Sequence, residues 1–159
     1  MSQDEPLEVK IAQRLTQAGK TLAPAESCTG GLIAHRITNV PGASAFFEGA
    51  VVAYSNAAKV AQLSVAAADL AQHGAVSTAV ATAMAHGVRT RLTADYAIAV
   101  TGIAGPSGGT ADKPVGLVFV AVANAEDVQV ERFEFEGGRE AIKEQTADAA
   151  LTLLWGRLA

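Results

Sequence analysis

The sequence has a single cysteine, Cys28, and few aromatic residues, which make up 5% of its 159 residues. One cysteine excludes an intramolecular disulfide and a cysteine-based zinc site, and it is typical of a reducing compartment. Half of the residues are hydrophobic. The interior is therefore expected to consist of Ala, Val, Leu and Ile rather than large rings, and we expect a cytoplasmic protein.

An excess of positive charge is also missing, since the formal net charge is −4 and both signs are interspersed. Nucleic-acid binding is therefore not expected. No apolar run approaches the ~20 residues of a membrane span, and the first ten residues are acidic where a signal peptide would be basic. Clustered His, Asp or Glu at ligand spacing is absent, so no metal is expected. Without a linker or repeat, the length predicts one domain over residues 1–159.

Apolar periodicity predicts alternating helices and strands. Helices are expected over 7–18, 32–38, 77–92 and 139–158, and one more should carry Lys59 behind a cap at Ser55 or Asn56. Strands are expected over 21–25, 46–54, 96–100, 115–124 and 128–135, the last two as a hairpin. This order predicts an α/β fold, a three-layer α/β/α sandwich with a mixed β-sheet.

The segment AESCTGG places Ser27 at the end of a predicted strand and just before a helix. The first N–H groups of a helix lack intrahelical partners, so Ser27 would lie beside a potential oxyanion or phosphate site. A simpler interpretation is that Ser27 or Thr29 only caps the helix. The segment alone does not distinguish the two.

A nucleophilic serine needs a base. The histidines, His35, His73 and His86, lie in or beside predicted helices without a nearby Ser-Asp pattern, and a histidine triad is unsupported. Lys59 lies among alanines and valine, and burial there would lower its pKa enough for it to act as a base. Tyr54, just upstream, could share the proton network. The alternative is that Lys59 extends to solvent from an amphipathic helix.

The glycine-rich segment TGIAGPSGG fits neither a P-loop nor a dinucleotide fingerprint. Its glycines would let backbone N–H groups approach an anion or a planar ring, or the segment is an ordinary wide turn. Cys28 has no evident histidine partner, and we interpret it as a packing residue.

The blocks AESCTGG, PGASAFFEGAVVAYSNAAKV, TGIAGPSGGTADKPVGLVFVAV and FEGGREAIKEQTADAALTLL together resemble the CinA C-terminal domain family, the nicotinamide mononucleotide amidohydrolases. The resemblance covers about residues 7–158. Many family members carry an additional N-terminal domain that resembles a molybdopterin-binding fold. The present sequence is similar to the stand-alone form.

The resemblance implies that Ser27 is the nucleophile and that Tyr54 and Lys59 complete the catalytic group. It implies hydrolysis of nicotinamide mononucleotide to nicotinate mononucleotide and ammonia without a cofactor. It also implies a homodimer or higher homo-oligomer. Substrate-binding residues are expected in three blocks: Thr29, Gly30, Gly31; Thr101, Gly102, Ala104, Gly105, Gly108, Gly109; and Arg139 as a phosphate ligand.

Two alternatives from other classes remain. One is a non-catalytic nucleotide-binding module, which has no need of Ser27, Tyr54 and Lys59 together. The other is a Ser-Lys amidase of a different small carboxamide, which has no need of the glycine loop and Arg139.

Overall fold

The computed structural model describes residues 4–158. Over these residues the chain forms six α-helices: α1 (Leu7–Ala18), α2 (Leu32–Thr38), α3 (Asn56–Leu63), α4 (Ala67–His73), α5 (Thr78–Arg91) and α6 (Arg139–Arg157). It forms five strands: β1 (Leu22–Glu26), β2 (Val51–Val52), β3 (Tyr96–Gly102), β4 (Leu117–Ala123) and β5 (Val128–Glu134). The predicted domain limits, residues 1 and 159, lie outside this range.

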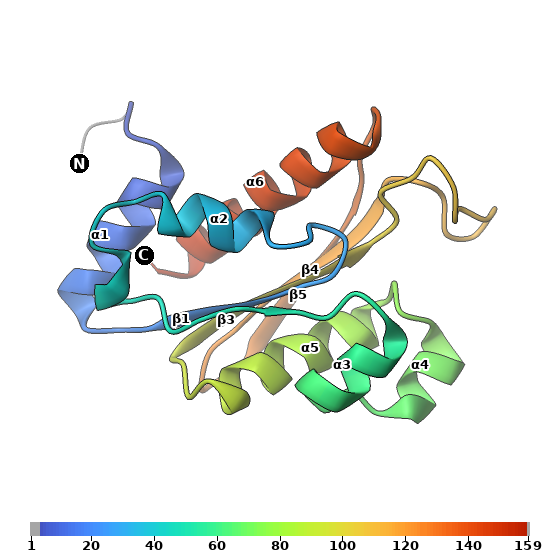
Figure 1. Ribbon diagram of the computed structural model, residues 1–159, viewed down its shortest axis with the longest axis horizontal. Coiled ribbons are helices and arrows are strands. Elements are labelled where there is room, and N and C mark those ends of the chain that lie inside the picture. The colour runs from blue at the N-terminus through green and yellow to red at the C-terminus, as the bar shows by residue number, and fades with distance from the viewer. Residues whose placement is uncertain (1–3, 159) are drawn as a thin grey trace.

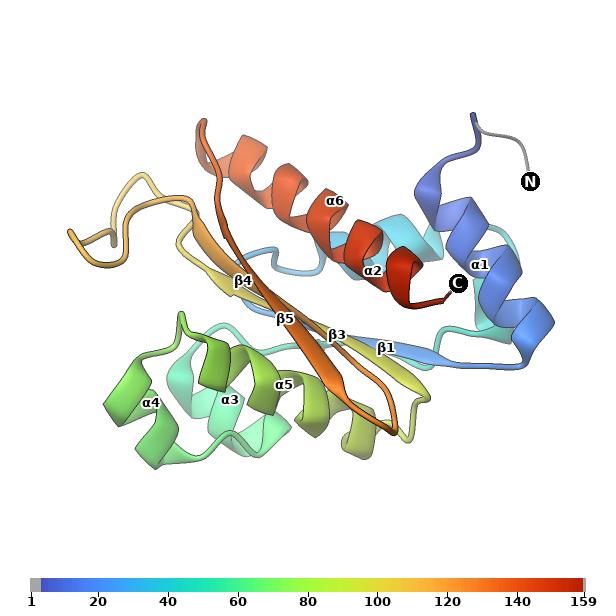
Figure 2. The ribbon, with the colours of Figure 1, turned by 180° about the vertical axis from the view of Figure 1, so that it is seen from behind.

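The strands form one mixed sheet in the order β2-β1-β3-β4-β5. β1 is parallel to β2 and β3, whereas β3, β4 and β5 are antiparallel neighbours. Helices α1, α2 and α6 cover one face, and α3, α4 and α5 cover the other (Figure 1). Figure 2 shows the same three layers from behind. The predicted three-layer α/β fold with a mixed sheet is confirmed.

Side chains of the central strands alternate between two cores. In β3, Ile98 and Val100 face the core of α1, α2 and α6, whereas Ala97 and Ala99 face the core of α5. Strand periodicity of two residues produces this alternation. The α5 side of the sheet is rich in alanine, which allows this helix to pack closely. Among residues 4–158, no helix combines the length and apolar character of a membrane span.

The strand predicted over 46–54 is reduced to the two residues of β2 and one isolated bridge between Leu22 and Phe47. Pro24 explains the interruption. The backbone N–H of Leu22 donates a hydrogen bond to the carbonyl of Phe46, on the side of β1 that faces β2. Every second residue of a parallel strand donates to the same side. Pro24 is two residues further and has no N–H to donate, so pairing breaks there.

Two further elements differ from the sequence predictions. α4 was not predicted, although its alanine-rich sequence ends at a glycine, Gly74. β3 continues to Gly102, so Thr101 and Gly102 belong to a strand and not to the glycine-rich loop. The strand continues because β4 pairs with it as far as Gly102.

Gly87 brings α3, the helix that carries Lys59, close to α5. A Cβ atom at Gly87 would lie 1.9 Å from the backbone oxygen of Leu63, at the end of α3. Real atoms cannot approach so closely, so a side chain at this position would displace α3.

We predict that Gly87→Ala lowers the free energy of unfolding by about 1–3 kcal/mol, because α3 has to move to relieve the overlap. Gly156→Ala is the matched control. Gly156 lies in α6, and a Cβ atom there would have no neighbour within 4 Å, so alanine should raise stability by up to about 1 kcal/mol through helix propensity. Urea denaturation measures both. Equal effects of the two substitutions would contradict the packing role of Gly87.

Candidate active site

Ser27 directly follows β1, at the carboxyl end of the parallel strands and before α2. The backbone N–H of Ser27 donates a hydrogen bond to the carbonyl of Val100 in β3, and the Ser27 carbonyl accepts one from the N–H of Gly30. Gly30 has a φ of +61°, which favours glycine. These contacts fold residues 27–31 into a tight turn, which we call the nucleophile turn, and they leave the Ser27 side chain 7% exposed.

The carboxylate of Glu26 caps helix α2. It is fully buried and accepts hydrogen bonds from the Thr29 hydroxyl at 2.6 Å and from the N–H groups of Ile33 and Ala34 at 2.9 and 3.0 Å. A negative charge at a helix N-terminus is stabilised by the helix dipole. The expected anion site at this helix end is thus already occupied by a carboxylate of the protein itself.

The capping role of Glu26 was missed by sequence reasoning, which treated it only as part of a motif. An acidic residue immediately before a predicted helix was the available signal. The Thr29 hydroxyl donates a hydrogen bond to the buried Glu26 carboxylate, so it faces the protein interior, and Thr29 is only 1% exposed. The direction of the Thr29 hydroxyl therefore does not support the substrate-binding role that was expected for this residue.

Lys59 is buried, with 2% exposure, beside Ser27. Of the two predicted caps, Ser55 is the one that caps α3: its side chain accepts a hydrogen bond from the N–H of Ala58, which fixes the start of the helix that carries Lys59. The Lys59 Nζ donates to Ser27 Oγ and to the backbone carbonyl of Tyr54, both at 3.0 Å. Burial lowers the pKa of Lys59 below its usual 10.5.

Tyr54 meets this group through its backbone rather than its phenol. Its side chain is 59% exposed, and the hydroxyl accepts a hydrogen bond from the Arg139 guanidinium at 2.7 Å. Arg139 also donates to the carbonyl of Gly105 at 2.7 Å. The two residues thereby connect β2, the glycine-rich loop and the start of α6.

Glycines of the TGIAGPSGG segment pack closely against the residues that lead into β4 and begin it. Cβ atoms at Gly102, Gly105 or Gly109 would lie 2.5 to 2.8 Å from Val115 or Val118, so the absence of a side chain serves the β3–β4 connection. Thr101 is buried and donates its hydroxyl to Ala75. The remaining expected positions differ in exposure: Ala104 is buried, Gly108 and Gly30 are exposed, and Gly31 is half-buried.

The other nucleophile and base candidates have unsuitable settings. His35, His73 and His86 are exposed and lie on α2, α4 and α5, in line with their interpretation as helix surface residues. Cys28 is a buried free cysteine. Burial and then the Glu26 charge raise its pKa to about 12, so the thiol stays protonated at neutral pH.

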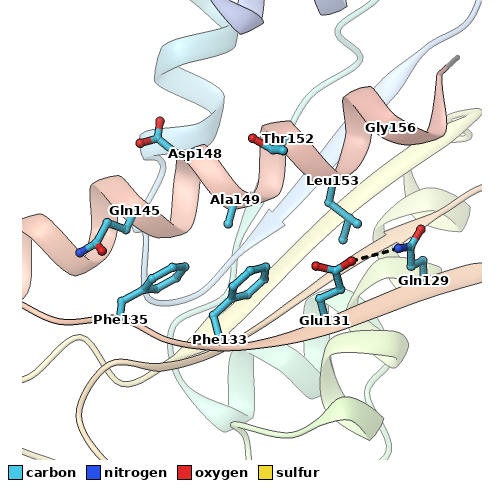
Figure 3. A pocket seen from close by; sticks show the side chains of 10 residues that line it. All are labelled: Gln129, Glu131, Phe133, Phe135, Gln145, Asp148, Ala149, Thr152, Leu153 and Gly156. Carbon is cyan, nitrogen blue, oxygen red and sulfur yellow. Dashed lines mark hydrogen bonds between the residues drawn. The ribbon is translucent and has the colours of Figure 1, made fainter.

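A cavity of about 600 Å³ lies between β5 and α6 (Figure 3). Phe133 in β5 and Phe135, just after this strand, have stacked rings and face α6, while Gln129 and Glu131 line the cavity further along β5. Asp148, Gln145 and other residues of α6 complete the lining. No Lys or Arg lines this cavity, and it holds two carboxylates. Such a lining does not favour a phosphorylated ligand.

Taken together, Ser27 and Lys59 are a hydroxyl and an amine in direct contact, and both residues are buried. An amine with a lowered pKa can accept a proton from the hydroxyl that it touches. Within the described range, no three His, Cys, Asp or Glu side chains gather as a metal-binding group would. The chemistry available from these side chains is nucleophilic attack by a serine.

Comparison with known proteins gives a consistent result. The CinA C-terminal domain family matches residues 4–158. A CinA-like protein of Geotalea daltonii is 51% identical over 150 residues, which are 94% of this chain and 36% of that protein. The chain spans little more than a third of the length of the first curated relatives that it matches.

Solved structures match over nearly their whole length. A CinA superfamily protein of Klebsiella pneumoniae is 38% identical with a TM-score of 0.92, over 96% of this chain and 95% of that one. The competence/damage inducible protein CihA of Agrobacterium tumefaciens is 40% identical with a TM-score of 0.89, over 98% of each chain.

We predict that Glu26→Gln lowers the free energy of unfolding by about 1–3 kcal/mol, because an amide offers one acceptor oxygen where the carboxylate offers two. Glu48→Gln is the control, since Glu48 is exposed, and its effect should stay within about 0.5 kcal/mol. Urea denaturation measures both. If Glu26→Gln were as stable as the wild type, the carboxylate cap would be unimportant.

Proposed function

The chain belongs to the CinA C-terminal domain family, and from this premise we propose that it hydrolyses the carboxamide of nicotinamide mononucleotide to nicotinate mononucleotide and ammonia. The observation that carries the proposal is the 3.0 Å hydrogen bond between the buried Lys59 Nζ and Ser27 Oγ. A binding module gains nothing from burying a lysine against a serine, because burying an amine costs free energy.

The first half of the reaction forms an ester on Ser27. Neutral Lys59 accepts the Ser27 hydroxyl proton while the oxygen attacks the carboxamide carbon, which gives a tetrahedral intermediate with a negatively charged oxygen. The Lys59 ammonium then returns the proton to the substrate nitrogen. The carbon–nitrogen bond breaks and ammonia leaves.

The second half repeats these proton transfers with water. Lys59 accepts a proton from water, the hydroxide attacks the ester carbon, and Ser27 leaves with the proton from Lys59 as nicotinate mononucleotide is released. For the oxyanion we propose the backbone N–H groups of Cys28 and Thr29, because they directly follow Ser27 in the nucleophile turn.

Tyr54 and Arg139 act in this scheme as positioning residues. The Tyr54 carbonyl accepts a second hydrogen bond from Lys59 and directs its amine toward Ser27. Arg139 holds the Tyr54 phenol and the Gly105 carbonyl. Arg139 is an exposed residue, and we propose that its guanidinium also contacts the substrate phosphate.

We also propose a homo-oligomer and a cytoplasmic location. Large hydrophobic side chains stay exposed near β2 and α3, namely Val52 at 49% and Val60 at 40%. Exposed large apolar side chains can be buried in contacts between copies of a chain. The free Cys28 thiol fits a reducing compartment.

We predict that the purified chain releases ammonia from nicotinamide mononucleotide and that Ser27→Ala reduces the rate by at least about 10³-fold, since the variant cannot form the ester. The ligand affinity of the variant should stay within a few-fold of that of the wild type. Ammonia release and calorimetric titration provide the two measurements. A wild-type chain that binds the nucleotide without ammonia release would instead be a binding module.

A second prediction concerns the pH dependence set by Lys59. Since burial lowers its folded-state pKa, activity should rise with pH as the amine loses its proton. Lys59→Met and Lys59→Arg should both be inactive, because neither side chain can accept the Ser27 proton at neutral pH.

Stability provides an independent readout of the same pKa. The unfolded chain holds the Lys59 proton more tightly, so the wild type loses stability at neutral pH, and this loss fades as pH rises from the folded-state pKa toward 10.5. Lys59→Met should therefore melt near or above the wild type at pH 7, with a difference that shrinks at high pH. An active Lys59→Met, or one that is inactive only because it is unfolded, would remove Lys59 as the base.

A further inference from the structure

A second lysine, Lys143, lies beside the nucleophile turn. It belongs to α6, which packs on the same face of the sheet as α2 (Figure 1). A Cβ atom at Gly30 would lie 3.8 Å from the Lys143 Nζ. The ammonium group is thus next to the turn that follows Ser27, on the opposite helix layer from Lys59.

The Lys143 ammonium has no hydrogen-bond or ion-pair partner among residues 4–158, although its residue is half-buried. Glu140 and Glu144 lie close to it in the sequence but are exposed and form no ion pair with it. All three line a cavity of about 450 Å³ between the start of α2 and α6. A half-buried cation without a counterion attracts an anion more strongly than an exposed one, because solvent screens it less.

Other positive groups near the turn are already engaged. The N-terminal N–H groups of α2 bind the Glu26 carboxylate. Arg139 donates from two nitrogens to Gly105 and Tyr54, and Lys59 contacts the nucleophile itself. Arg139 is thus a cation that two hydrogen bonds already hold in place, whereas Lys143 is a cation beside the turn that no hydrogen bond holds among residues 4–158.

We propose that Lys143 binds the phosphate of a phosphorylated carboxamide substrate and thereby selects nucleotide over nucleoside. This inference rests on the proposed amidase function of Ser27. The phosphate is remote from the reacting carbonyl, so its binding energy serves to place that carbonyl at Ser27. Loss of Lys143 therefore affects the phosphorylated substrate selectively.

The test compares kcat/KM for nicotinamide mononucleotide and nicotinamide riboside in the wild type, Lys143→Gln and Lys143→Arg. Lys143→Gln should lose about 10- to 100-fold on the mononucleotide, as expected for a charged hydrogen bond, and about twofold or less on the riboside. Lys143→Arg should recover most of the loss, since arginine also binds phosphate. Lys20→Gln is the control, because Lys20 is exposed and precedes the opposite end of β1.

Equal losses on both substrates, or no loss on either, would overturn the proposal while leaving the amidase function intact. Equilibrium titrations of Ser27→Ala, with and without Lys143→Gln, separate the two claims. If the wild type hydrolyses neither substrate, the amidase function is wrong. The Lys143 site then still stands if Lys143→Gln weakens binding of the mononucleotide at least tenfold but leaves binding of the riboside unchanged. It is wrong if Lys143→Gln leaves mononucleotide affinity unchanged or weakens the binding of both ligands equally, or if neither ligand binds.

Discussion

Burial of the Lys59 amine is the constraint on which the site depends. An ammonium removed from water loses hydration free energy, and only good local hydrogen bonds offset that loss. Here the acceptors are Ser27 Oγ and the Tyr54 carbonyl. Both must be held in place, which requires the nucleophile turn after β1 and the chain segment after β2 to keep a fixed separation. The position of the lysine thus links the sheet to the chemistry.

The surrounding elements meet this requirement by close packing and by one buried carboxylate. Gly87 lets α3 approach α5 until backbone atoms touch, which brings Lys59 inward. Glu26 anchors α2 and Thr29 at the same strand end that carries Ser27. The carboxylate thereby stabilises the turn and also occupies the helix N-terminus. Recognition of a substrate anion must therefore come from side chains such as Lys143, and not from the helix dipole of α2.

Much of this arrangement follows from the sequence. Strong periodicity located α1, α2, α5 and α6 within one or two residues, and the strand-turn-helix pattern around Ser27 was identified correctly. Predictions were less accurate where contacts between distant residues determine the length of a strand or the role of a glycine. Pro24 shortens β2 through a missing donor on the neighbouring strand. The glycines of the TGIAGPSGG segment prove to serve packing against Val115 and Val118. No local pattern indicates that Gly30 and Lys143 meet, because this contact joins residues far apart in the chain.

The most direct test of the central claim is covalent trapping. Wild-type protein mixed with nicotinamide mononucleotide and quenched in acid within milliseconds should carry nicotinate mononucleotide as an ester, and peptide mass spectrometry should locate it. Residues 27 and 28 are adjacent, so fragmentation has to separate them. The account predicts the adduct on Ser27. An adduct on Cys28, or ammonia release without any adduct on Ser27 under conditions in which the ester should accumulate, would contradict it.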